Sequence, residues 1–224
     1  MKSLLLALTI ALLSSCALLA PAPDDAPGGG TYEPPVVTGP GNTPSPTTPA
    51  PAPSPTTTPR AADNYAGRFN SPTAADLLRP NAGADLPFPI YSQFSQVEPL
   101  LNLNDGTTYV VNFWASWCRP CLQEMPLLQR MMNERTDVKV ITISLDKPQD
   151  VRTKLLDLVY DRNINLPIVA LTDDAYDKWR SRVDRTWTRT TIPVTLVYNG
   201  GRRRFNKGAI LDYEQLSDLV RRVR

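Results

Sequence analysis

Two cysteines, Cys118 and Cys121, stand three residues apart in the segment Trp117-Cys118-Arg119-Pro120-Cys121. An apolar run that predicts a buried strand precedes them, and a pattern of helical period follows them. At the first turn of a helix the helix dipole favours a thiolate over a thiol, so Cys118 is suited to attack. A second thiol within reach can then resolve a mixed disulfide. The spacing therefore predicts a reversible dithiol–disulfide pair.

The other readings of this pair are a metal site and a structural crosslink. The chain has three cysteines and no histidine, which excludes Cys-His and Ser-His-Asp catalysis. A structural zinc ion needs about four ligands and one such pair supplies two, so we expect no metal. A disulfide that closes a loop of about four residues removes only on the order of 2 kcal/mol of unfolded-state entropy. The pair is therefore predicted to be a redox couple.

The chain begins like an exported protein. Residues 1–20 combine the positive Lys2 with an apolar stretch, which predicts an export signal. Within it, Leu13-Ser14-Ser15-Cys16 resembles a bacterial lipobox, whose cysteine is lipidated and becomes the mature N-terminus. An ordinary cleaved signal and an uncleaved anchor are the alternatives. We predict lipidation of Cys16 and an extracytoplasmic, lipid-anchored place in the envelope of a bacterial cell.

Composition divides the remaining chain into three parts. Residues 21–60 are rich in Pro, Thr and Ser, which predicts a disordered linker that holds a catalytic head off the membrane. Its alternative is a ligand for proline-binding domains. Residues 61–87 are transitional. Residues 88–224 have a globular pattern, and their number suffices for one compact α/β domain.

Strands and helices alternate through this last part. Apolar runs and helical periods predict an α/β fold, a central mixed sheet flanked by helices on both faces. We expect a kink at Pro126 and a hairpin whose type I′ turn is Asn199-Gly200. The predicted strands are 109–114, 138–144, 166–171, 194–198 and 202–206, and the predicted helices are 118–135, 150–162, 174–183 and 212–223.

Three motifs together resemble a known family. They are residues 112–121, Glu124-Met125-Pro126 and Thr191-Ile192-Pro193. This combination is similar to the thioredoxin superfamily, and within it to the TlpA/ResA-type extracytoplasmic thiol-disulfide oxidoreductases. The resemblance covers roughly residues 88–224. It implies a thioredoxin-like fold with the insertion of that subgroup, here about residues 149–171.

The resemblance also implies roles for single residues. Cys118 would be the nucleophile and Cys121 the resolving thiol, joined in a redox disulfide in the oxidised state. Pro193 would be a cis-proline facing this dithiol. Ile192 before it and Trp117 would contact the substrate.

Two polar residues of these motifs bear on proton transfer to and from the sulfur of Cys121. Glu124 would lie one helical turn after Cys121 and relay a proton to or from that sulfur. We expect it at the rim of the dithiol and not in the core, and a plain solvated carboxylate is the alternative. Asn112 occupies the place of a buried aspartate in cytoplasmic thioredoxins. Because an amide does not titrate, proton transfer would depend on Glu124 or water.

The predicted function is that of a membrane-tethered reductase without a cofactor. Its partners would be exported cysteine-containing proteins, such as apocytochrome c or envelope proteins, and a membrane electron donor. A disulfide donor and a stalked binding module without enzymatic activity remain alternatives. A peroxide-reducing protein of the same superfamily is a further one, although the Pro-x-x-x-Thr-x-x-Cys context of peroxiredoxins is absent.

The net charge of +2 includes basic clusters at residues 202–204 and 221–224. Nucleic-acid binding would need a recognisable module, which the chain lacks, so we expect no nucleic-acid partner. These arginines are predicted to form a solvated face, or to attract anionic lipid weakly.

Overall fold

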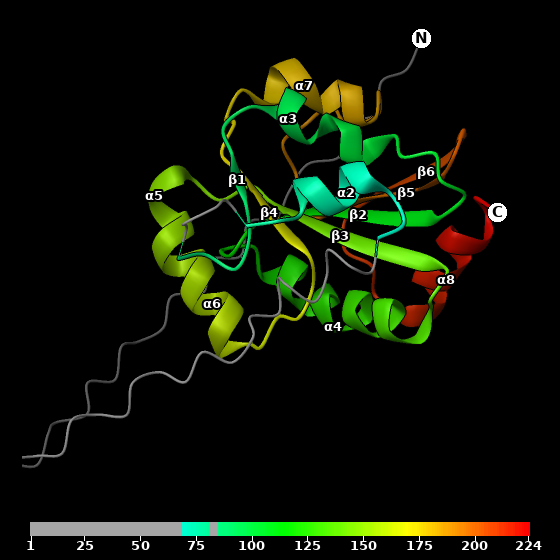
Figure 1. The fold of residues 1–224 in the computed structure, drawn as a ribbon, viewed down its shortest axis with the longest axis horizontal. Helices are drawn as coiled ribbons and strands as arrows, with labels where there is room; N and C mark the ends of the chain where they lie inside the picture. The colour runs from blue at the N-terminus through cyan, green and yellow to red at the C-terminus, as the bar shows by residue number, and fades with distance from the viewer. Residues whose placement is uncertain (1–68, 81–84) are drawn as a thin grey trace, which may run out of the picture. The chain divides into compact units, whose positions relative to one another are not determined.

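The computed structural model describes residues 69–80 and 85–224. The predicted signal, Cys16 and the Pro-rich linker lie outside these residues. The described part is an α/β structure built on one six-stranded sheet with the order β1-β4-β3-β2-β5-β6 (Figure 1). Its strands are β1 (Ile90–Tyr91), β2 (Thr108–Trp114), β3 (Val138–Ser144), β4 (Ile168–Leu171), β5 (Val194–Asn199) and β6 (Arg202–Lys207).

The sheet is mixed, as predicted. Strands β1, β4, β3 and β2 run parallel, whereas β5 is antiparallel to β2 and β6 to β5. The carboxyl ends of β2 and β3 therefore lie at the same edge as the start of β5, where Phe113 pairs with Val194. Loops that follow β2 and β3 meet the loop that precedes β5 at this edge.

Helices cover both faces of the sheet, which confirms the predicted fold class (Figure 1). One face carries α4, α6 and α8, and the other carries α2, α3 and α7. The helical elements are α2 (Pro72–Leu77), α3 (Phe94–Val97), η1 (Glu98–Leu101), α4 (Arg119–Glu134), α5 (Pro148–Asp150), η2 (Val151–Leu155), α6 (Leu156–Asp161), α7 (Tyr176–Val183) and α8 (Tyr213–Arg221). The segment α5–η2–α6 and strand β4 occupy the stretch expected for the subgroup's insertion.

Alternation along β2 assigns its side chains to the two cores. Tyr109, Val111 and Phe113 are buried in the core under α3 and α7. Val110 and Trp114 are buried in the core under α4 and α8. Because successive side chains of a strand point to opposite faces, Asn112 faces α4.

The first described segment belongs to the packed unit. Phe69, Ala74 and Leu78 are buried in the core under α3 and α7, with α2 beginning at the N-cap Ser71. Phe69 stacks on Tyr109 at a centroid distance of 6.4 Å. The packing thus extends N-terminal to residue 88, where the globular pattern of the sequence begins.

Helix α4 at Pro126 and the turn between β5 and β6 were both subjects of local predictions. Helix α4 continues through Pro126 to Glu134, because the tertiary contacts of its buried face outweigh the loss of one backbone hydrogen bond. The prediction of a type I′ turn at Asn199-Gly200 was wrong. Asn199 pairs with Arg202, so the two-residue turn is Gly200-Gly201, and only Gly200 has positive φ.

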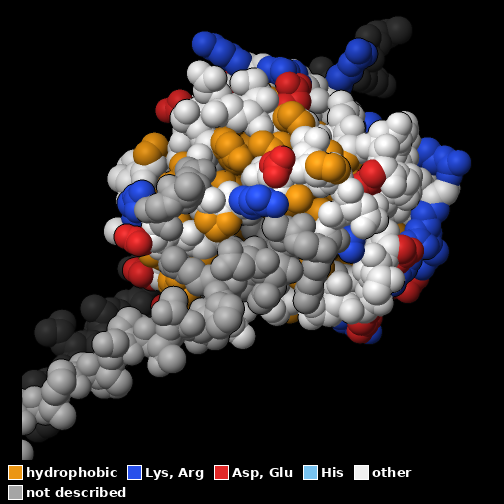
Figure 2. Space-filling view, in the orientation of Figure 1, with side chains coloured by type: hydrophobic (Ala, Val, Ile, Leu, Met, Phe, Trp, Pro, Cys, Tyr) orange, Lys and Arg blue, Asp and Glu red, His pale blue; other side chains and the backbone are white. Residues whose placement is uncertain are grey.

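The C-terminal arginines are paired with acids. Arg221 and Arg222 lie within 3.3 Å of carboxylates of α8, and Arg224 pairs with Asp137. Figure 2 shows blue and red side chains interspersed at the edge where α8 ends. This pattern is typical of a solvated face. Within residues 69–80 and 85–224, no helix has the length and apolar character that a membrane span requires.

Candidate redox site

The two cysteines lie at the start of α4 and form a disulfide. Cys118 is the N-cap of the helix, Pro120 is in its first turn, and the Cα atoms of Cys118 and Cys121 are 5.3 Å apart. The Cys118 Sγ also accepts a hydrogen bond from the Cys121 backbone N–H at 3.3 Å. A thiolate formed at Cys118 would face the unpaired N–H groups of a 16-residue helix. Local geometry thus favours a charged sulfur at this position.

A buried carboxylate that the sequence analysis missed holds the loop before the cysteines. Asp146 follows β3 and is 1% exposed. It accepts hydrogen bonds from the Ser116 backbone N–H at 2.9 Å, the Ser116 hydroxyl at 2.6 Å and the Ser144 hydroxyl at 2.6 Å. The neighbouring Leu145 N–H donates to the Trp114 carbonyl at 2.8 Å. The end of β3 therefore fixes Trp114 and Ser116, which precede Trp117.

The loop before β5 contains a cis peptide bond between Ile192 and Pro193. The Arg180 guanidinium holds this loop in place by donating hydrogen bonds to the Thr188 carbonyl at 2.7 Å and to the Thr190 hydroxyl at 2.9 Å. The loop ends at the sheet edge where the cysteine loop also lies. Ile192 packs against the core cluster that contains both cysteines.

Glu124 lies in the core and not at the rim, so that expectation was wrong. Its residue exposure is 0%. Its Oε1 accepts a hydrogen bond from Asn112 Nδ2 at 2.6 Å, and its Oε2 accepts one from the Ile210 backbone N–H at 2.8 Å. The physical reason is that Asn112 on β2 and the chain before α8 enclose this turn of α4. The alternative of a solvated helix carboxylate is excluded as well.

Burial changes the acidity of this group. Desolvation raises the pKa of Glu124 to about 7, although the hydrogen bonds from Ile210 and Asn112 favour the ionised form. Asn112 Nδ2 also donates to Thr195 at 3.0 Å, while Asn112 Oδ1 has no hydrogen-bond partner among the described residues. A carboxyl that exchanges its proton near neutral pH thus lies one helical turn from Cys121.

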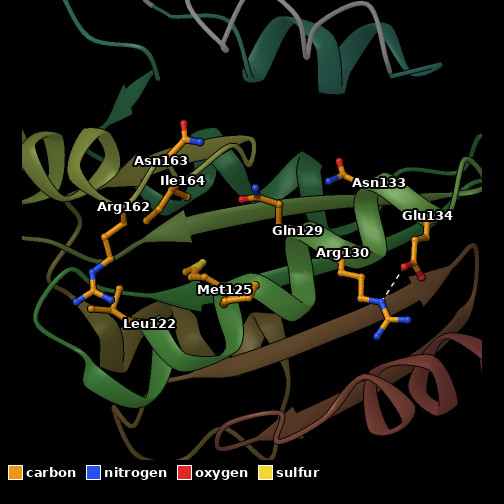
Figure 3. Close-up of a pocket in the computed structure, with 10 residues that line it drawn as sticks. Leu122, Met125, Gln129, Arg130, Asn133, Glu134, Arg162, Asn163 and Ile164 are labelled. Carbon is orange, nitrogen blue, oxygen red and sulfur yellow. Dashed lines mark hydrogen bonds and ion pairs between the residues drawn. The ribbon is translucent and has the colours of Figure 1, made fainter.

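Two cavities lie near α4. The first, of about 840 Å³, lies beside the cysteine loop and is lined by Trp117, Leu145, Lys147, Gln149, Asp150, Lys154, Tyr176, Thr190 and Ile192. Trp117 and Ile192, the residues expected to contact substrate, thus share one cavity. The second, of about 530 Å³, runs along α4 from Leu122 to Glu134 and is closed by Arg162, Asn163 and Ile164 (Figure 3). Neither cysteine lines this second cavity. Among the described residues, no group of three side chains could hold a metal ion.

The family comparison agrees with this architecture. The model of the AhpC/TSA family matches residues 94–200, which run from α3 to the end of the β5–β6 turn. Residues 94–200, a little under half of the 224-residue chain, are thus similar to the AhpC/TSA family. Both site loops and the cis bond lie within the matched residues.

Relatives of the domain include several proteins named as oxidoreductases. The thiol-disulfide oxidoreductase ResA of Oceanobacillus iheyensis is 35% identical over 65 residues, 28% of this chain and 33% of that protein. The sporulation thiol-disulfide oxidoreductase A of Bacillus subtilis is 29% identical over 98 residues, 43% of this chain and 55% of that protein. The alignments therefore span about a third to a half of these relatives. The expected similarity to ResA-type proteins is confirmed.

Two solved structures resemble parts of the chain. StoA from Bacillus subtilis matches with a TM-score of 0.39 and 26% identity, covering 52% of this chain and 84% of that one. A thioredoxin-related protein from Neisseria meningitidis serogroup B matches with a TM-score of 0.44 and 23% identity, at 52% and 84% coverage.

Proposed function

We propose that this protein is a thiol-disulfide oxidoreductase that reduces disulfides of exported proteins. The observation that carries the proposal is the Cys118–Cys121 disulfide at the first turn of α4, at the sheet edge that also bears the cis Ile192–Pro193 bond. A disulfide whose partners are three residues apart adds little to stability. Its position at a helix N-terminus instead suits exchange.

The reaction begins with the reduced pair. The Cys118 thiolate attacks one sulfur of a substrate disulfide, so a Cys118–substrate bond forms, the substrate S–S bond breaks, and one substrate thiolate leaves. Cys121 loses its proton and attacks the Cys118 Sγ, which forms the intramolecular disulfide and releases the second thiolate. Two electrons pass to the substrate, whose two thiolates take up two protons. A dithiol reductant, proposed to be a membrane electron donor, then regenerates the pair.

Glu124 is proposed to move the proton of Cys121. Its raised pKa leaves it partly protonated near neutral pH, so it can accept a proton when Cys121 attacks and return it when Cys121 leaves. The Asn112 side chain can hydrogen-bond to Glu124 in both its ionised and its protonated state. Its amide nitrogen donates to the ionised carboxylate. Its unpartnered Oδ1 could accept from the protonated form after the amide rotates.

Single substitutions of the two cysteines test whether Cys118 attacks the substrate and Cys121 resolves the mixed disulfide. We expect Cys118→Ser to abolish insulin reduction, and Cys121→Ser to accumulate mixed disulfides with substrates, because the resolving thiol is missing. Non-reducing gels and mass spectrometry of both variants measure this. Trapped partners on Cys118→Ser but not on Cys121→Ser would reverse the assignment.

A peroxidase is the second candidate, because the matching family is AhpC/TSA. Peroxide consumption with a thiol reductant tests it. Turnover of peroxide without reduction of insulin would favour this candidate over disulfide exchange.

The cellular setting is proposed from the sequence. Lipidation at Cys16 would tether the domain to a bacterial membrane through the Pro-rich linker, on the extracytoplasmic side. Exported cysteine-containing proteins would then be the substrates. The similarity to the ResA protein, and to the thiol:disulfide interchange protein DsbE homolog of Paracoccus denitrificans, supports this choice (32% identity over 100 residues, 49% of the DsbE homolog).

A further inference from the structure

We propose that the cavity beside the disulfide is a substrate subsite that takes a bulky apolar side chain next to an acidic residue. The inference rests on the proposed disulfide exchange and specifies the substrates that this exchange selects.

The cavity is lined by residues next to the reacting groups, although neither cysteine is itself among the lining residues. Trp117 and Ile192 both line it, and they directly precede Cys118 and the cis Pro193. Its other lining residues come from the loop after β3, which reaches the same sheet edge, and from α5, η2, α7 and the loop before β5. A substrate segment whose sulfur meets Cys118 must pass between these loops, so its neighbouring side chains face the cavity.

The walls suit a large apolar side chain. Trp117 is 65% exposed, and among the described residues the other exposed large hydrophobic side chains are Tyr160 and Leu211. Of these only Trp117 lines this cavity, together with Leu145, Tyr176 and Ile192. The volume of about 840 Å³ lies within the range of ligand pockets. An aromatic or leucine-sized side chain would cover Trp117 from water.

Among the charged side chains that line the cavity, one pair is neutralised and one lysine is not. Asp150 and Lys154 pair at 2.9 Å and offset each other. Lys147 is exposed, and its ammonium has no ion-pair partner within residues 69–80 and 85–224. Asp174, Asp146 and Asp173 are close enough to Tyr176 to raise its pKa, after the larger effect of burial, but none of the three lines the cavity. Lys147 is therefore the unpaired charge among the residues that line the cavity, and it attracts a carboxylate in the substrate.

The cavity of Figure 3 fits this role less well. Its residues come from α4 beyond the first turn and from the loop after α6. Arg130 there is already paired with Glu134 at 2.8 Å. Neither Trp117 nor Ile192 lines it, so a segment bound there has no path to Cys118 along the cavity wall.

The experiment compares disulfide-bonded peptides as single-turnover substrates of the full, pre-reduced chain. Their cysteine pair is flanked on both sides by Phe-Glu, by Ala-Glu or by Phe-Lys, and alkylation followed by mass spectrometry measures the rates. Lys147→Glu is the test variant. Lys178→Glu is the matched control, because Lys178 is exposed on α7 and does not line this cavity.

We expect the wild type to reduce the Phe-Glu peptide about tenfold faster than the Ala-Glu peptide and about threefold faster than the Phe-Lys peptide. Lys147→Glu should reverse the Glu–Lys preference and retain the Phe–Ala preference, and Lys178→Glu should match the wild type. Equal rates for Phe and Ala peptides, or an unreversed charge preference, would overturn the subsite. Reduction of insulin without any of the peptides would also overturn it. If insulin too is left oxidised, the proposed function itself fails.

Discussion

At the scale of single residues, Glu124 has the clearest chemical consequence. It is fully buried and accepts hydrogen bonds from Asn112 and Ile210, and its pKa is raised to about 7. The folded state therefore holds a proton that the unfolded state releases at lower pH. The stability from this proton is fully present below the unfolded pKa of 4.5 and is lost as pH rises through about 7.

The first prediction concerns the pH dependence of stability and of exchange. The free energy of unfolding should fall by about 3 kcal/mol between pH 4 and pH 8 in the wild type. Glu124→Gln should remove this slope and the inflection near pH 7 in insulin reduction. Near pH 5 the variant should be about as stable as the wild type, because the Glu124 carboxyl is protonated there and a glutamine side chain has the same shape and neutral charge. Urea unfolding and rate profiles across this pH range measure both effects.

The control for this variant is Glu134→Gln on the same helix. Glu134 is exposed and pairs with Arg130 on the surface, so its loss should leave the free energy of unfolding close to that of the wild type. Identical pH profiles for Glu124→Gln and the wild type would show that Glu124 takes no part in proton transfer.

The second residue-scale prediction concerns Asp146. Asp146→Ala leaves Ser116 and Ser144 without their buried acceptor, so we expect a loss of more than about 2 kcal/mol in the free energy of unfolding. Exchange should slow as well, because the loop before Trp117 loses its anchor. Urea unfolding and insulin reduction measure the two losses. Asp161→Ala, at an exposed position on α6, should leave both quantities near the wild type. A wild-type rate in Asp146→Ala would contradict the anchoring role.

At the scale of elements, α2 and its flanking residues should stabilise the domain although they precede the thioredoxin-like motifs. Leu78 is 4% exposed and packs in the core under α3 and α7. Leu78→Ala should lower the free energy of unfolding by about 2–5 kcal/mol, because it leaves a cavity in that core. Leu211→Ala is the matched control, since Leu211 is 83% exposed. Equal denaturation midpoints of the two variants would show that this segment does not pack in solution.

At the scale of the whole molecule, the tether and the catalytic domain should be separable. Cys16→Ala is expected to release the protein from membranes or to leave an unprocessed precursor, because the proposed acyl chains would be absent. Insulin reduction by the purified variant should equal that of the wild type. Cell fractionation and mass spectrometry of the N-terminus make the measurement. Unchanged membrane attachment of a still acylated variant would exclude lipidation at this cysteine.

The sequence by itself determined the cysteine pair, the strand–helix alternation and the mixed sheet. These depend on local spacing and on hydrophobic period, which are written along the chain. It misplaced the hairpin turn by one residue, since three residues, Asn199, Gly200 and Gly201, can form it and only the register between β5 and β6 selects the pair.

Only the tertiary structure decided the surroundings of the site. Asn112, Glu124 and Ile210 meet because β2 directs alternate side chains toward α4 and because the chain before α8 returns to the same place. The anchoring of Ser116 by Asp146 joins the ends of two strands that are neighbours in the sheet but 30 residues apart in the chain. Such contacts follow from strand register and burial, and so do the pKa of Glu124 and the walls of the cavity beside Cys118.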